Sequence, residues 1–370
     1  MPGNQDISKK IECYSNRIYG ESQIAKMKTI KIEEMISSRK WIDDMKSVVG
    51  ENRTIEIYIS PGGDRMNPYN PETDEWEESR SKKPEKWQYR TMRKTFQQVN
   101  KAFGVTIKQT KRESSADLRI ALTTLEDNWS LNGDWSDGGD YIEIYMVYER
   151  PKGKRGRHSK SQMKDWKHIF THEIGHLLGL EHPWDKDDGD YAVKNENEVT
   201  VDTLMGYSSY DSFGDLKVWF QDIDIKSLLR IWGRSKQPDK KLLRAPQFVM
   251  GNIKDDKLNG FKRKKSVLIG LKGNDILSGG KLGDLLDGGY ENDILTGNAG
   301  RDIFRLSRGK DVITDFDSRR DGIQIGFDLE PYQIIKEGLD VRVDHQRGST
   351  LITGAVIAEV KNAISYISWD

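Results

Sequence analysis

A nine-residue repeat over residues 269–304 constrains the fold of this chain more than any other feature. Its four units read IGLKGNDIL, SGGKLGDLL, DGGYENDIL and TGNAGRDIF in consecutive register. One phase of the repeat is glycine, at Gly270, Gly279, Gly288 and Gly297. Another phase is aspartate followed by two apolar residues, at Asp275, Asp284, Asp293 and Asp302. The pattern predicts an all-β parallel β-roll in which glycines form the turns, the apolar pairs form short strands, and the aspartates bind calcium between turns.

The repeat is imperfect, which limits the number of calcium sites that we expect. Leu271 and Asn298 occupy the second-glycine phase, and Leu282 and Glu291 occupy the third. We therefore expect two or three calcium sites. The preceding unit, GFKRKKSVL, has Ser266 at the aspartate phase and a basic run that repels a cation, so it is predicted to be an end turn without metal.

Glycine distribution separates the repeat from an ordinary globular region. Residues 1–250 hold 17 of the 34 glycines, whereas residues 251–304 hold 11. Upstream, apolar alternation at 55–59, 118–122 and 142–146 predicts strands, and helical periodicity precedes Gly104 and Gly233. The order of these elements indicates an α/β (α+β) domain. The expected organisation is an N-terminal region or candidate pro-segment at 1–52, the α/β domain at 53–233, a linker at 234–250, and the roll with a C-terminal β cap at 251–370.

The strongest chemical signal is the motif HEIGHLLGLEH, with histidines at 172, 176 and 182. His172 and His176 are four residues apart, so on a helix both side chains project from one face and can bind one Zn²⁺. Gly179 can adopt a left-handed conformation that ends the helix and returns the chain with His182 as a third ligand. Three protein ligands leave one position for a water, whose pKa zinc lowers to about 7. Glu173 then lies where it can take the proton of that water.

Two other interpretations of the motif remain open. One is an amphipathic helix that contains three histidines without binding metal. The other is a domain that keeps its zinc but has lost activity.

With Pro183 after the third histidine, the motif resembles the metzincin zinc signature, and within it the serralysin branch. By this resemblance, Met205 in Thr203–Tyr207 belongs to a Met-turn beneath the zinc, and Tyr207 stabilises the oxyanion. The glycine–aspartate repeats resemble the RTX repeats that follow the protease domain in serralysins, and residues 309–325 resemble the cap that closes their roll. The resemblance covers residues 53–370, and the first 50 residues match no pattern that we can name.

Composition excludes several classes of protein. Lys+Arg and Asp+Glu are both 59, so the net charge of zero argues against a general nucleic-acid binder. No stretch reaches the roughly 18 apolar residues of a membrane span. The single cysteine, Cys13, excludes an internal disulfide framework. The N-terminus lacks the apolar core of a secretory signal, so export would need another route.

Each of three weaker features allows either a purely structural or a functional interpretation. The acidic group from Asp185 to Asp190 is a solvated loop or a calcium-stabilised one. The basic run from Lys152 to Lys160 is a solvated loop, or it favours acidic substrates. Cys13 is a surface thiol, or it coordinates the zinc and keeps the enzyme latent.

Together these features predict a secreted, extracellular zinc-dependent endopeptidase, expected to be a monomer, that acts on protein or peptide substrates. By resemblance, a type I secretion system would export it through an uncleaved C-terminal signal. An alternative is a non-catalytic calcium-binding surface or adhesion protein with a relic zinc domain. A further alternative is an intracellular metallopeptidase whose repeats never bind calcium.

Overall fold

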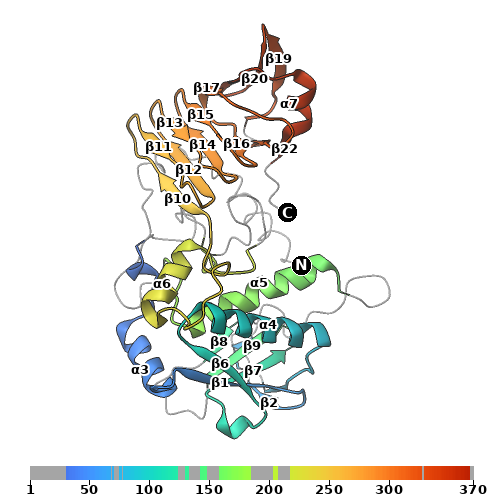
Figure 1. The fold of residues 1–370 in the computed structure, drawn as a ribbon. Coiled ribbons are helices and arrows are strands. Elements are labelled where there is room, and N and C mark those ends of the chain that lie inside the picture. Colours follow the sequence, from blue (N-terminus) through green and yellow to red (C-terminus); the bar gives the residue numbers. More distant parts are fainter. Residues whose placement is uncertain are drawn as a thin grey trace.

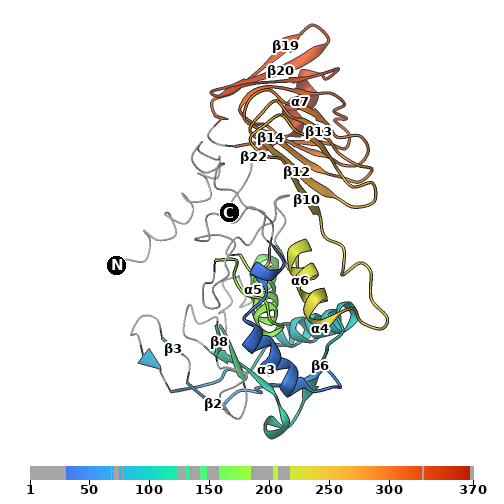
Figure 2. The same cartoon turned by 90° about the vertical axis from the view of Figure 1, so that its left-hand side faces the viewer.

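The chain forms an α/β unit followed by a β-roll, which lie one above the other in Figures 1 and 2. The structure is a computed structural model. It describes residues 31–67, 69–70, 75–76, 78–123, 130–132, 142–147, 158–184, 203–206, 217–326 and 329–366. The predicted fold class, an α/β domain followed by an all-β parallel roll, is confirmed.

The α/β unit is built on a five-stranded sheet in the order β6-β1-β7-β9-β8. Its strands are β1 (Thr54–Ile59), β6 (Thr106–Thr110), β7 (Leu118–Thr123), β8 (Ser130–Asn132) and β9 (Ile142–Val147). Only β8 is antiparallel to its neighbour. The expected alternation holds in β1, whereas every residue of the central strand β7 is buried, because both of its faces are covered.

Two short antiparallel pairs lie between β1 and α4 (Lys86–Ala102) in the sequence. These are β2 (Arg65–Met66) with β5 (Ser79–Arg80), and β3 (Tyr69–Asn70) with β4 (Glu75–Trp76). A 3-10 turn, η2 (Glu113–Ser115), precedes β7.

The helices of this unit begin and end at recognisable capping residues. They are α3 (Arg39–Val49), α4 (Lys86–Ala102), α5 (Lys160–Leu177) and α6 (Asp222–Trp232). Ser159 caps α5, because its Oγ accepts the Gln162 N–H at 3.1 Å while Gln162 accepts the Ser159 N–H. At the other end of α5, Gly179 has φ +94°, the left-handed conformation that the motif predicted.

Residues upstream of the boundary expected at residue 53 share the core of the α/β unit. Met35 and Met45 are completely buried, and Ile42 and Val49 nearly so, in the same cluster as the residues of α5. The 3-10 turn η1 (Glu33–Met35) leads into a backbone bridge between Ile36 and Leu180. The N-terminal segment therefore packs against the chain that leaves α5.

The roll consists of two facing sheets that the chain visits in turn (Figure 1). One sheet contains β10 (Gln247–Met250), β12 (Ser266–Leu271), β14 (Leu285–Gly289), β16 (Ile303–Arg305), β18 (Gly322–Ile325) and β22 (Ile364–Tyr366). The other contains β11 (Lys257–Asn259), β13 (Ile276–Ser278), β15 (Ile294–Thr296), β17 (Gly309–Ile313), β21 (Gly348–Ile352), β20 (Asp340–His345) and β19 (Gln333–Glu337). Val267 pairs with Leu285, and Ile276 with Ile294, so one coil uses two nine-residue units.

The glycines of the first phase have a steric role rather than the turn-forming role that the sequence suggested. None of the four has a positive φ. A Cβ on Gly270 would lie 2.3 Å from Asp275 Oδ2, and a Cβ on Gly288 would lie 2.1 Å from Asp293 Oδ2. Each of these glycines therefore leaves space for the carboxylate five residues later.

Residues 309–325, which resembled the closing cap, form a further coil instead. β17 and β18 continue the two sheets. The roll is closed by the antiparallel strands β19, β20 and β21 together with α7 (Ile357–Ala363). The resemblance placed the end of the roll one coil too early because this coil lacks the first-phase glycines.

Among the described helices, none has both the length and the hydropathy that crossing a membrane requires.

We predict that Met45→Ala lowers the free energy of unfolding of the α/β unit by about 2–5 kcal/mol, the usual cost of removing a buried Met side chain. The control is Val48→Ala on the same helix, where the side chain is 45% exposed and the change should stay within about 0.5 kcal/mol. Tryptophan fluorescence in denaturant measures both, because every tryptophan except Trp369 lies at or before Trp232. Equal stability of the two variants would mean that α3 is not part of this core.

Candidate metal centres

The structure brings the three histidines of the motif into one cluster. His172 and His176 lie on α5, and His182 follows the turn at Gly179. One ligand atom from each histidine lies within 4.8 Å of those of the other two. His176 Nε2 and His182 Nε2 are 3.1 and 3.3 Å from His172 Nε2. Ligands at about 2.0–2.1 Å from a tetrahedral zinc are separated by about 3.3 Å, so the cluster has the dimensions of a zinc site.

Backbone carbonyls fix which nitrogen faces the centre in the two helical histidines. His172 Nδ1 donates to Leu204 O at 2.7 Å, and His176 Nδ1 donates to Leu180 O at 2.9 Å. This leaves the Nε2 lone pairs directed at one another, which is favourable only with a cation between them. Burial, and then the neighbouring His176 and His182, hold the pKa of His172 well below its usual value. The ring is therefore neutral, as a metal ligand must be.

Met205 packs directly against α5 beneath the histidines. Its side chain is fully buried, and a Cβ on Gly175 would lie 2.6 Å from Met205 Sδ. Gly175 stands between the two helical histidines, so the absence of a side chain there allows the close contact. The Met205 N–H also donates to Thr203 Oγ1.

Asp224 on α6 anchors the Thr203–Met205 turn, and the sequence analysis missed it. Its carboxylate accepts hydrogen bonds from Thr203 Oγ1, from Leu204 N at 2.7 Å and from Gln221 N at 2.8 Å. Complete burial raises the pKa of Asp224 to about 6. Leu204 links this carboxylate to the cluster, because its carbonyl accepts from His172. The available signal was an aspartate in the first turn of the helix predicted to end at Trp232.

The structure describes only some of the other residues predicted around this centre. Glu173 is 5% exposed on α5, beside His172. Tyr207 lies outside the described residues, as do Cys13, the acidic segment 185–190 and the basic segment 152–157.

The four predicted aspartates of the roll form two rows, one along each edge. Each side chain is 0–1% exposed. Each Oδ1 accepts a backbone N–H from one coil earlier, as in Asp275 N to Asp293 Oδ1 and Asp284 N to Asp302 Oδ1, both 2.8 Å. The carboxylates thus tie successive coils together.

Three further aspartates extend the rows beyond the glycine-rich units. Asp256 N donates to Asp275 Oδ1, Asp293 N to Asp311 Oδ1, and Asp302 N to Asp321 Oδ1. Asp311 is nine residues after Asp302 and precedes Val312-Ile313, so the repeat period contained the signal to find it. Asp321 is displaced by one residue from the period, which hides it from a strict pattern.

These carboxylates are poorly compensated, which fits calcium as their partner. Asp275 Oδ2 and Asp293 Oδ2 are buried without a hydrogen-bond partner. Burial, followed by repulsion from neighbouring carboxylates, raises the pKa of Asp275 to about 6 and of Asp293 to about 8. The pKa values of Asp302 and Asp311 are raised to about 7, again chiefly by burial. Oxygen-rich, negatively charged groups of this kind are what Ca²⁺ prefers.

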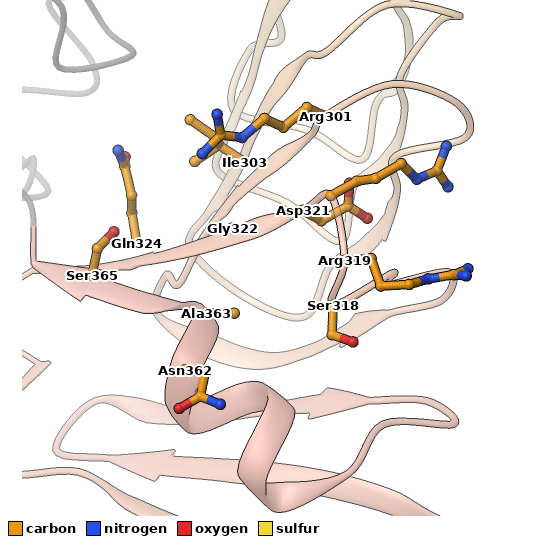
Figure 3. Close-up of a pocket in the computed structure, with 11 residues that line it drawn as sticks. Arg301, Ile303, Ser318, Arg319, Asp321, Gly322, Gln324, Asn362, Ala363 and Ser365 are labelled. Carbon is orange, nitrogen blue, oxygen red and sulfur yellow. The ribbon is translucent and has the colours of Figure 1, made fainter.

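A hollow of about 540 Å³ near the end of the roll does not resemble an enclosed ligand site. Figure 3 shows Arg301 and Arg319 extending to opposite sides of it, with Asp321 between them. Because the charged groups diverge, this hollow provides no converging set of contacts.

Comparison with known protein families assigns a general class to each centre, a metallopeptidase domain for the histidines and a calcium-binding repeat for the aspartates. The family described as metallo-peptidase family M12B, reprolysin-like, matches residues 147–218. The RTX calcium-binding nonapeptide repeat (4 copies) matches residues 266–281 and 282–313. The first match implies zinc and the second implies calcium, so both predicted cofactors are confirmed, as is the resemblance to a metallopeptidase with RTX repeats. The serralysin branch stays a prediction.

No curated protein matches the chain, and the solved structures that match it include two of limited similarity. The extracellular lipase LipA from Serratia marcescens is 22% identical with a TM-score of 0.29, over 33% of this chain and 21% of the lipase. The AlgE6R2 subunit of the Azotobacter vinelandii mannuronan C5-epimerase is 23% identical with a TM-score of 0.28, over 35% of this chain and 98% of that subunit. This chain therefore spans about a fifth of the lipase structure that it matches.

We predict that acid partly replaces calcium in stabilising the roll. The folded pKa values of Asp275, Asp293, Asp302 and Asp311 lie above the ordinary 3.8, so between about pH 4 and 8 the folded state binds more protons than the unfolded state. Stability without calcium must then fall as pH rises through this range. With saturating calcium the dependence should reverse, because protons and calcium compete for the carboxylates.

The measurement is thermal unfolding followed by circular dichroism at pH 5, 6, 7 and 8, using the transition that calcium shifts. A calcium-free midpoint that is flat, or higher at pH 8 than at pH 5, would contradict the prediction.

Proposed function

We propose that the protein is a secreted zinc-dependent endopeptidase of serralysin type, which cleaves peptide bonds in protein substrates. The observation that carries the proposal is the convergence of three Nε2 atoms, with the rings of His172 and His176 tied back through Nδ1 to backbone carbonyls. The metallopeptidase match over residues 147–218 supports the reaction class.

In this proposal His172, His176 and His182 hold the zinc. When bound, the metal supplies Lewis-acid chemistry at a peptide carbonyl and makes a water acidic near neutral pH. Glu173 takes the proton from the attacking water and delivers it to the leaving amine. Its 5% exposure keeps the carboxylate in a medium where proton transfer is little disturbed by bulk water. Tyr207 donates a hydrogen bond to the developing oxyanion.

The positions of these groups depend on the surrounding fold. Met205 forms an apolar floor against Gly175, and Asp224 holds the turn whose Leu204 carbonyl orients His172. Secretion, export by a type I system and a monomeric state are part of the same proposal. They rest on the RTX repeats, which are typical of secreted proteins, and on the resemblance stated above.

We predict that Glu173→Ala retains zinc but loses about 10²–10⁴-fold in kcat, because the residue is a base and not a ligand. His176→Ala should lose both the metal and the activity. The matched control is Asp165→Ala on the same helix, where the carboxylate accepts from Ser161 Oγ at 3.3 Å on an exposed face, and it should retain both. Casein hydrolysis with and without a zinc chelator, together with atomic absorption, measures activity and occupancy.

Each outcome separates the alternatives. Full zinc occupancy in His176→Ala would disprove the ligand assignment. Wild-type protein that binds zinc but cleaves no substrate would favour the calcium-binding surface protein with a relic zinc domain.

We predict that Tyr207→Phe lowers kcat with little change in KM, since the hydroxyl contact forms mainly in the transition state. The variant keeps the aromatic ring and should bind zinc as the wild type does. An unchanged kcat would remove Tyr207 from the mechanism.

A further inference from the structure

Two buried ionisable side chains beside the histidine cluster have no role in the mechanism described above. Lys217 is 3% exposed, and His168 is 6% exposed. His168 lies on α5, one turn before His172, and Lys217 lies in the segment that precedes α6. Removing an ammonium group from water is costly unless its charge is compensated, so a lysine in this position needs specific partners.

The Lys217 ammonium binds the turn that orients the first histidine. Its Nζ donates to the carbonyl oxygen of Thr203, which is 1% exposed, at 2.8 Å. The next carbonyl along the chain is that of Leu204, which accepts from His172 Nδ1 at 2.7 Å. A charged donor makes a stronger hydrogen bond than a neutral one, and this donor is one peptide group away from the carbonyl that orients His172.

A carboxylate binds the opposite side of the same peptide group. In a trans peptide the oxygen and the N–H point in opposite directions. The oxygen between Thr203 and Leu204 accepts from Lys217, and the N–H donates to Asp224 Oδ2 at 2.7 Å. Burial raises the pKa of Asp224 to about 6, and the positive charge of Lys217 acts against this rise. A buried cation and a buried anion therefore hold one peptide group between them and compensate each other's charge.

His168 fixes the backbone from which the lysine side chain extends. Burial lowers the pKa of His168 to about 4, so its ring is neutral and carries a single N–H. The contact of Nδ1 with the Lys217 carbonyl oxygen at 2.5 Å places that N–H at Nδ1. Successive turns of α5 thus donate to two carbonyls, that of Lys217 from His168 and that of Leu204 from His172.

Together these contacts form a closed circuit that includes a predicted zinc ligand. The Leu204 carbonyl binds His172, and the adjacent Thr203 carbonyl binds the Lys217 ammonium. The Lys217 carbonyl binds His168, and α5 connects His168 back to His172. A change at any member therefore shifts the carbonyl that orients the ligand. Groups that orient a ligand in this way typically account for about 10–100-fold in metal affinity or activity.

A second lysine nearby has a different environment and provides the matched control. The side chain of Lys226 on α6 is 49% exposed, and its Nζ pairs with Asp222 Oδ2 at 2.6 Å on the surface of the helix. Exposed pairs of this kind contribute little to stability. Replacing Lys226 therefore removes the same charge without touching the circuit.

We propose that Lys217 is a positioning residue of the metal centre: its ammonium fixes the Thr203–Leu204 peptide group and, through it, the carbonyl that orients His172. Asp224 opposes the ammonium across this peptide group, and His168 anchors the lysine backbone. The inference rests on the proposed function only in that the three histidines bind a metal, and it does not depend on peptide-bond cleavage.

The first experiment measures the zinc affinity of the full chain by competition with a chromophoric chelator. Lys217→Met keeps most of the side-chain volume and removes the charge and the donor, so it should weaken zinc affinity by about 10–100-fold. Lys226→Met should bind zinc as the wild type does. Unchanged zinc affinity in Lys217→Met would overturn the proposal.

A second measurement separates positioning from stability. Cobalt(II) in place of zinc has visible absorption bands that report the geometry of its ligands, and saturating cobalt removes the effect of affinity. Lys217→Met should change these bands, whereas Lys226→Met should leave them as in the wild type. A lysine that only stabilises the fold would leave the bands unchanged in both variants, and this result would also overturn the proposal.

The double variant Lys217→Met with Asp224→Asn covers the case in which the single variant fails to fold. It leaves no uncompensated charge in the core, and asparagine can still accept from Leu204 N through its oxygen. Its zinc-free unfolding temperature should lie closer to that of the wild type than the temperature of Lys217→Met does. Its zinc affinity should stay reduced, because the Thr203 carbonyl still lacks its donor.

The outcomes distinguish this inference from the proposed function. Wild-type zinc affinity in the double variant would overturn the role of Lys217 and leave the zinc peptidase intact. Wild-type protein that binds no zinc would instead contradict the proposed function. Zinc binding that weakens in Lys217→Met, in a protein that cleaves no substrate, would support the positioning role and contradict the proposed catalysis.

Discussion

The hydrogen bond from a backbone N–H to an aspartate Oδ1 one coil later determines most of the C-terminal half. It fixes the register between turns, since Asp275 N reaches Asp293 Oδ1 and Asp284 N reaches Asp302 Oδ1. It also draws the four repeat aspartates inside their turns, where a glycine five residues earlier leaves space for each carboxylate. The same burial removes the carboxylate from water, so its charge must be balanced by a cation, a proton or further N–H donors. This one contact therefore accounts for the period of the repeat, for the glycines that leave space for the carboxylates, and for the need to balance their charge.

The histidine cluster is organised by the backbone in a similar way. The carbonyls of Leu204 and Leu180 orient two imidazoles, and the carboxylate of Asp224 holds the turn that contains Leu204. The ligands come from one helix and its exit, but their orientation depends on α6 and on the N-terminal segment. Both centres are therefore local in sequence and dependent on distant elements for their geometry.

The sequence predicted the parts of this molecule that follow from a period or a fixed spacing. The nine-residue phase predicted the strands and four of the aspartates, and the spacing of His172, His176 and His182 predicted the cluster. It missed Asp224, because nothing local indicates that an aspartate at a helix start reaches a turn twenty residues before it.

The segment before α3 limits how far the N-terminus can be trimmed. The Glu181 N–H, immediately before His182, donates to Met35 O at 3.2 Å. The Ser37 N–H donates to Gly179 O at 3.0 Å. A maturation cut beyond Ser37 would remove both contacts and uncover the side of the core that Met35 covers. Proteolytic processing that preserves the third ligand must therefore stop upstream of Met35, and N-terminal sequencing of the active form would locate that limit directly.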